Sequence, residues 1–219
     1  MSRTYSVFAE RRINGVWTLI GDPSDSPCYD CPRPPDALWI SSHSELITIL
    51  CGHQVICCDV DNTGVETIAP PRGLPDDLSP VLRAWAELEI RERLAHNPSW
   101  LLAREILDFD WHTPKILYRG YVMAEMARHF DPDPETPFPE EAWGGWYDAV
   151  PNPHALERRL QIPGNREEDF VYIWPRPGTV EVHWCESHYQ AVGHLDEFFA
   201  ELRELGPTDT VRLVFWIDD

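Results

Sequence analysis

The sequence predicts an α+β fold in which an antiparallel or mixed sheet carries helices packed mainly on one side. Two apolar segments flank an Asn-Gly turn near the N-terminus, and a strand–helix–strand pattern occupies residues 179–219. Helical patterns lie between them rather than alternating regularly with strands, which favours α+β over α/β. The 219 residues are 43% apolar, enough for a sizeable core. We therefore expect a single domain over residues 1–219.

The N-terminal strands are predicted at residues 5–10 and 16–20. Asn14-Gly15 lies between them, and this pair readily adopts the positive φ values of a tight hairpin. Residues 21–35 contain five prolines and are predicted to be a loop. Residues 44–59 are ambiguous, because their apolar side chains fit a short helix as well as a buried strand.

The middle of the chain is predicted to be mainly helical. Ser79 and Pro80 fit the start of a helix that runs to about Ala95. The apolar spacing predicts that this helix buries four side chains, Val81, Leu82, Trp85 and Leu88. His96-Asn97-Pro98 should end it, and a second helix is predicted over residues 100–107. A strand over 115–121 and a short helix near 123–130 follow.

The C-terminal part is predicted to contain strands at 170–174, 180–184 and 211–217. A single helix over 186–205 is expected before the last strand, ended by Gly206-Pro207. The last strand has five consecutive apolar residues, Leu213 to Ile217. Such a strand is too apolar for a solvated edge, so it should lie inside a sheet.

Residues 131–153 are predicted to form a surface insertion. They contain six prolines and no basic residue. Trp143 and Trp146 allow two interpretations, which the sequence leaves open. Their rings can fold back on the core, or they can form an adhesive patch within an acidic rim, since large aromatic side chains are favoured interface anchors.

The formal net charge is −19, from 37 acidic and 18 basic residues. This charge excludes nucleic-acid binding through a broad basic surface, because phosphates would be repelled. It favours a basic protein as partner, with solubility alone as the alternative explanation. No 18-residue apolar run occurs and the first residues lack a signal-peptide pattern, so we expect a cytoplasmic protein that does not bind membranes.

Two groups of residues could bind a metal ion. Cys28 and Cys31 have the C-x-x-C spacing of a zinc knuckle, for which residues 51–58 could supply further ligands. His183, Cys185 and His188 could meet where the strand over 180–184 gives way to a helix, although histidines flanking a helix start need bind nothing. Zinc is the cofactor that these residues suggest, and we otherwise expect none.

A third group combines carboxylates with imidazoles. Asp108, Asp110 and His112 occupy alternate positions near Trp111, and His96 precedes them. Carboxylates with a histidine can bind a divalent cation or share acid–base work if they converge. A solvated helix end explains the same residues without any chemistry. The full set of predicted binding residues is Arg72, His96, Asp108, Asp110, Trp111, Trp143 and Trp146.

Four segments of the chain resemble a family of uncharacterised acidic proteins carried by tailed phages and their bacterial hosts. They are residues 5–10 together with 15–17, then 71–79, 96–101 and 211–218, so the resemblance covers both ends and the middle but not the insertion. Many of those relatives open with Asp-Ile-His, where this chain has Ser6-Val7-Phe8. The resemblance implies a genomic context, and it implies no metal role at these positions.

The standard phosphate-binding, dinucleotide-binding, nucleophile-elbow and zinc-protease motifs are absent, which argues against an enzyme of those classes. The sequence therefore favours a non-catalytic acidic binding protein that engages a basic host factor, with inhibition of a host defence as one form. The alternative is a small metal-dependent hydrolase or nucleotide-binding protein that uses His96, Asp108 and Asp110, with His183 and His188 as further candidates.

Overall fold

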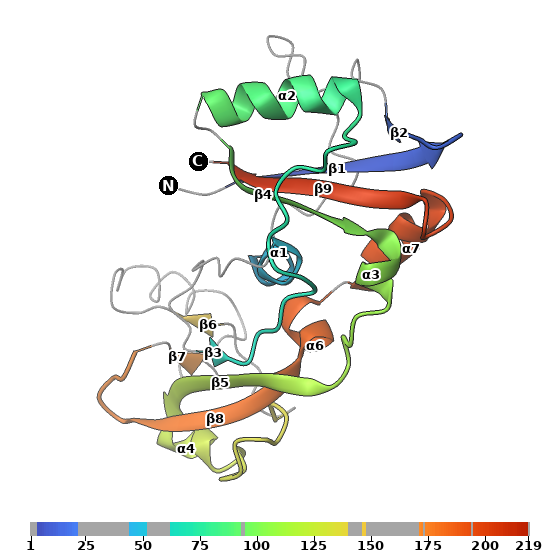
Figure 1. Ribbon diagram of the computed structural model, residues 1–219. Helices are drawn as coiled ribbons and strands as arrows, with labels where there is room; N and C mark the ends of the chain where they lie inside the picture. The colour runs from blue at the N-terminus through green and yellow to red at the C-terminus, as the bar shows by residue number, and fades with distance from the viewer. Residues whose placement is uncertain are drawn as a thin grey trace, which may run out of the picture. The chain divides into compact units, whose positions relative to one another are not determined.

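A computed structural model (Figure 1) describes residues 4–21, 44–51, 62–92, 95–139, 146–147, 171–172, 174–193 and 195–218. An antiparallel sheet, a mixed sheet and helices make up the fold, as the predicted α+β class requires. The chain divides into two compact units, one from residues 1–55, 66–109 and 192–219 and one from 56–65 and 110–191. Compact packing does not by itself distinguish one domain from two, so the single-domain interpretation stays a prediction.

The first unit is built on a four-stranded antiparallel sheet with the order β2-β1-β9-β4. Its strands are β1 (Thr4–Ile13), β2 (Val16–Leu19), β4 (Ala95–Leu102) and β9 (Val211–Asp218). β9 pairs with β1 on one side and β4 on the other, and residues 211–217 are all buried. The prediction that the last strand lies inside a sheet is therefore confirmed.

The N-terminal hairpin is also confirmed. Asn14 and Gly15 join β1 to β2 with φ values of 51° and 85°. These left-handed conformations match the turn twist to that of the flanking strands. The hairpin places Trp17 opposite Arg12, on the sheet face that also carries Glu10.

Helices cover both faces of this sheet rather than mainly one side, as Figure 1 shows, with α2 above it and α1 and α7 below. The helices of the first unit are α1 (Ser44–Cys51), α2 (Pro80–Arg91), α3 (Ala103–Leu107) and α7 (Leu195–Glu204). α1 resolves the ambiguity of residues 44–59 in favour of a helix as far as residue 51. Between α2 and the sheet lies a core cluster of Phe8, Leu78, Leu82, Ala86, Val214 and Trp216.

The second unit contains a long antiparallel pair, β5 with β8. Its elements are β3 (Asn62–Thr63), β5 (Pro114–Met123), α4 (Ala124–Ala127), β6 (Trp146–Tyr147), β7 (Val171–Tyr172), β8 (Thr179–Ser187) and most of α6 (His188–Val192). Its core cluster consists of Ile116, Tyr118, Val122, Met126, Val171, Val182 and Trp184. The strand predicted at 115–121 and the helix after it are present.

The helix predicted from residue 100 is wrong over its first three positions. Residues 95–102 form β4, whose Trp100 and Leu101 lie opposite Val214 and Leu213 of β9. A bulge between His96 and Ser99, with Asn97 at a φ of 50°, accommodates Pro98. Pairing with a distant strand outweighs the local helical pattern, and α3 begins only at Ala103.

The single helix predicted over 186–205 is two helices in the structure. β8 continues to Ser187, α6 ends at Val192 and α7 begins at Leu195. Gly193 lies between the helices with a φ of 65°. That conformation is the left-handed one that ends helices, and glycine adopts it without the steric cost of a Cβ.

α2 is rotated relative to its predicted orientation. Leu82 and Ala86 are buried, whereas Val81 and Leu88, which were predicted to be buried, are 52% and 37% exposed. The hydroxyl of Ser79 does not cap the helix either. Instead the backbone N–H of Ser79 donates to Oε1 of Glu10 at 2.8 Å, so a carboxylate from β1 holds the start of α2.

The two faces of α2 should respond differently to truncation. We expect Leu82→Ala to lower the free energy of unfolding by about 2–5 kcal/mol, because it leaves a cavity in the core cluster. Val81→Ala, one residue away on the exposed face, should change it by about 0.5 kcal/mol or less. Urea denaturation of both variants measures the difference, and equal losses would contradict the orientation of α2.

Candidate functional site

A buried arginine lies on the α2 side of the first unit's sheet. The side chain of Arg212 is 2% exposed. Its guanidinium lies 2.7 Å from Oε2 of Glu10 and donates to Oδ1 of Asp77 at 2.6 Å. It also lies over the ring of Trp17, at 4.1 Å from the ring centroid. A buried guanidinium needs such carboxylate partners, because desolvation of an unpaired charge is very costly.

The same two carboxylates are held by further donors. Nε1 of Trp17 donates to Oδ2 of Asp77 at 2.9 Å, and Glu10 accepts from the backbone of Ser79. Partial burial acts to raise the pKa of Asp77, but the hydrogen bond and charge of Arg212, with the Trp17 bond, hold that pKa below its ordinary value. This network, which sequence reasoning missed, is structural, since its groups are occupied by one another.

Arg72 lies in a second arginine cluster of the first unit. It makes a bidentate ion pair with Glu105, at 2.6 and 2.9 Å, and its guanidinium lies over the Trp100 ring at 4.8 Å. The hydrogen bond from Arg72 lowers the pKa of Glu105, assisted by the backbone N–H of Leu102 and opposed by burial. Arg72 was predicted to bind a partner, but here its guanidinium donors serve this cluster.

His96 and Asp108 are exposed residues of the first unit. His96 lies in β4 beside the bulge, and Asp108 follows α3, where its N–H donates to the carbonyl of Arg104 at 2.9 Å. The location of Asp108 matches the solvated helix end that the sequence left open. Neither residue belongs to the arginine clusters described above.

Asp110 and Trp111 are the first two residues of the segment 110–191 of the second unit. Oδ1 of Asp110 accepts the N–H of Thr113 at 3.2 Å, and Oδ2 lies 3.3 Å from Nζ of Lys115. The bonds from Thr113 are the main cause that lowers the pKa of Asp110 to about 2. Trp111 is buried, and its carbonyl accepts the N–H of Tyr189 at 2.8 Å. Asp110 is therefore an ionised turn residue with local partners.

Two of the proposed metal ligands, His183 and His188, differ in burial. His183 is exposed on β8, with Nε2 at 3.4 Å from Glu181, whereas His188 is fully buried at the start of α6. No group of three or more histidine, cysteine, aspartate or glutamate side chains that could hold a metal ion occurs within the described ranges. Cys28 and Cys31 lie outside those ranges, so the zinc prediction for them stays a prediction.

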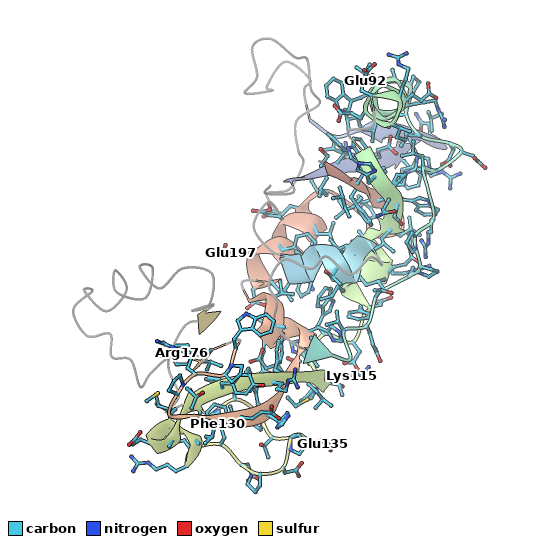
Figure 2. All side chains as sticks on the ribbon, turned by 90° about the vertical axis from the view of Figure 1, so that its left-hand side faces the viewer. Glu92, Lys115, Phe130, Glu135, Arg176 and Glu197 are labelled. Carbon is cyan, nitrogen blue, oxygen red and sulfur yellow. The ribbon has the colours of Figure 1, made fainter. Side chains whose placement is uncertain are left out.

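The insertion predicted over 131–153 is described as far as residue 139, and this part packs on the second unit. Phe130 (labelled in Figure 2) and Phe138 lie against Trp184. Their ring centroids are 5.9 and 5.1 Å from that of Trp184. The carbonyl of Thr136 accepts the backbone N–H of Cys185 at 2.7 Å. Trp143 and the side chain of Trp146 lie outside the described residues, and only the pairing of the Trp146 backbone with β7 is seen.

Three exposed carboxylates share one face of α7. Glu197, Glu201 and Glu204 are spaced at i, i+4 and i+7 and are all exposed, opposite the buried Leu195, Phe198, Phe199 and Leu202. Figure 2 labels Glu197. We call these three glutamates the acidic face. The guanidinium of Arg203 lies 5.9 Å from the centroid of the Phe199 ring rather than in an ion pair with them.

Comparisons with known proteins give a single short similarity to report. No protein-family model matches the chain, and no solved structure matches it. The all-trans-zeta-carotene desaturase of Myxococcus xanthus is 34% identical over 68 residues, which are 31% of this chain and 13% of the desaturase. Because the chain spans so little of that enzyme, the desaturase activity is not assigned to this chain.

No described helix is long and apolar enough to cross a membrane.

The buried network should show strong coupling between its charges. We expect Arg212→Met to cost about 3–5 kcal/mol of unfolding free energy, because it leaves Glu10 buried without its cation. The double variant Glu10→Gln with Arg212→Met should be more stable than Arg212→Met alone. A double-mutant cycle in urea measures this coupling, and purely additive effects would contradict the network.

The Arg72–Glu105 pair predicts a pH dependence with a definite sign. The folded pKa of Glu105 lies below its ordinary value of 4.5, so the unfolded chain binds more protons between the two values. The stabilisation is complete above about pH 6 and is lost as the pH falls through the folded pKa. The stability difference between wild type and Glu105→Gln, measured by urea denaturation, should shrink below pH 4.5. A difference that stays constant down to about pH 3 would contradict this.

Proposed function

We propose that the chain is a non-catalytic binding protein whose acidic surface engages a basic protein. The observation that carries the proposal is that several arginines are engaged within the protein, whereas many carboxylates are exposed. Arg72, Arg176 and Arg212 lie over aromatic rings of their own units. Arg72 and Arg212 also pair with carboxylates, whereas the acidic face stays exposed. With a formal net charge of −19, the surplus of carboxylates therefore remains available to a partner.

Only Glu197 of the acidic face, in the first turn of α7, lies where a carboxylate stabilises the helix through its dipole. Glu197 and Glu201 are four residues apart, where like charges destabilise a helix by about 0.2–0.5 kcal/mol. Solubility requires net charge, but it does not require the carboxylates to be gathered on one stripe. A basic partner, in contrast, would be attracted and oriented by such a stripe.

The proposed origin of the chain and the proposed kind of partner rest on the family resemblance. It supports a chain carried by a phage or mobile element, acting in the host cytoplasm on a host protein. Inhibition of a host defence is the activity that we propose within this class. Direct binding to nucleic acid is not part of the proposal, because the net charge of −19 would repel phosphates.

Capture experiments at different salt concentrations test the proposal. The full chain is immobilised and exposed to bacterial lysate, and the retained proteins are eluted by a sodium chloride gradient and identified by mass spectrometry. We expect a basic protein that elutes as salt rises from about 0.1 to about 1 M, since the screening length falls from roughly 10 to 3 Å. Retention that is insensitive to salt would count against the proposal.

A matched pair of variants tests whether the acidic face takes part. Glu197→Gln, Glu201→Gln and Glu204→Gln together remove three charges, whereas the three corresponding Glu→Asp changes keep them. The Gln variant should release the partner at lower salt than wild type, and the Asp variant should behave like wild type. Identical elution of all three proteins would place the partner elsewhere on the surface.

A further inference from the structure

α2 carries apolar side chains on the face that points away from its sheet. Val81, Ala84 and Leu88 are exposed and spaced at i, i+3 and i+7, which places them on one stripe. Ile90, 40% exposed, lies near the end of the helix. We call Val81, Ala84 and Leu88 the outer stripe. This spacing normally marks a buried helix face, but none of the described residues buries the outer stripe.

This stripe differs from ordinary surface scatter. The other exposed large apolar side chains in the described ranges are Ile13, Val16, Leu117, Trp174 and Val180. Single apolar residues on a surface need no explanation, but Val81 and Leu88 lie on one face of a 12-residue helix with Ala84 between them. Trp85 flanks the stripe, where it is partly exposed and also packs against the core cluster beneath the helix.

The charges around the stripe indicate which kind of partner fits it. From Pro75 to Glu92 the chain has five carboxylates and two arginines. Arg83 lies 3.8 Å from Glu87 and Arg91 lies 3.4 Å from Glu92, so both arginines are already used on the helix. A second copy of the chain would bring two such acidic rims together, with a net charge of −19 each.

We infer that the outer stripe of α2 is the apolar centre of the docking surface for the basic protein of the proposed function, on which this inference rests. The partner presents an amphipathic helix whose apolar side chains pack on Val81, Ala84 and Leu88, with a lysine or arginine beside them that faces the exposed carboxylate of Asp76. α2 spans about 18 Å, long enough for two to three turns of such a helix.

A peptide titration tests the inference. The probe is a synthetic 18-residue amphipathic helix of leucine and lysine, added to the ¹⁵N-labelled full chain and followed by NMR. We expect amide shifts concentrated on residues 80–91. Val81→Ser with Leu88→Ser should weaken binding by about tenfold or more, because two apolar anchors are lost.

The matched control is Ile13→Ser with Val16→Ser, which changes two equally exposed apolar residues at the hairpin, at 44% and 63% exposure. This control should bind the peptide like wild type, and both double variants should keep the wild-type unfolding midpoint. A lower midpoint for the α2 variant alone would mean that the chain itself covers the stripe. A dimer seen by sedimentation and lost in that variant would mean that a second copy does. Either result would overturn the inference.

The same titration separates this inference from the proposed function. If the α2 variant binds the peptide as wild type does but the acidic-face Gln variant does not, the inference fails and the proposed function stands. If the peptide does not bind at all, or binds equally to every variant, the inference also fails. The salt-dependent capture of a basic protein then decides the proposed function independently.

Discussion

The pairing of Arg212 with Glu10 and Asp77 is the interaction on which the first unit depends. It joins residues that are 202 positions apart in the chain, and so it joins the last strand to the first. The guanidinium donates to both carboxylates and to the carbonyl of Asp77 at 3.1 Å, while the Trp17 ring lies over it. Burial of a charge is tolerated because so many of its donors are satisfied.

This network also determines where α2 lies. The second oxygen of Glu10 accepts the N–H of Ser79, the residue that precedes the helix. The loop before the helix is fixed as well, because Asp77 binds both Arg212 and Trp17. With its start held in this way, α2 presents Leu82 and Ala86 to the sheet and turns Val81 and Leu88 outward. An ionic contact on the sheet thus selects which apolar face of the helix remains available.

Local patterns predicted those parts of the fold that local chemistry decides. The Asn14-Gly15 turn and the apolar run of β9 required no knowledge of distant residues. β4 was predicted as a helix in part, because only its pairing with β9 makes residues 95–102 extended. The break at Gly193 was missed for a related reason, since apolar spacing continues across it from Val192 to Leu195.

The candidate site was harder to predict than the fold. Arg212 stands beside an apolar run and Glu10 within a strand, and nothing local reveals that the two meet. Arg72 was predicted to bind a partner, but Glu105 and Trp100 lie 33 and 28 positions away, and the sequence could not show that they occupy its guanidinium. Spacing identifies residues able to take part in chemistry, whereas tertiary pairing decides which of them remain free.

Two separate contributions to binding follow for the proposed complex, one from exposed charge and one from apolar contact. Exposed carboxylates such as those of the acidic face act over roughly a Debye length and therefore accelerate encounter, an effect that salt weakens. The outer stripe acts only at contact, so it governs the lifetime of the complex, and salt affects it little. Because the arginines of the first unit are used largely within it, the long-range attraction is not cancelled, and because α2 is held by Glu10, the stripe is presented in one orientation.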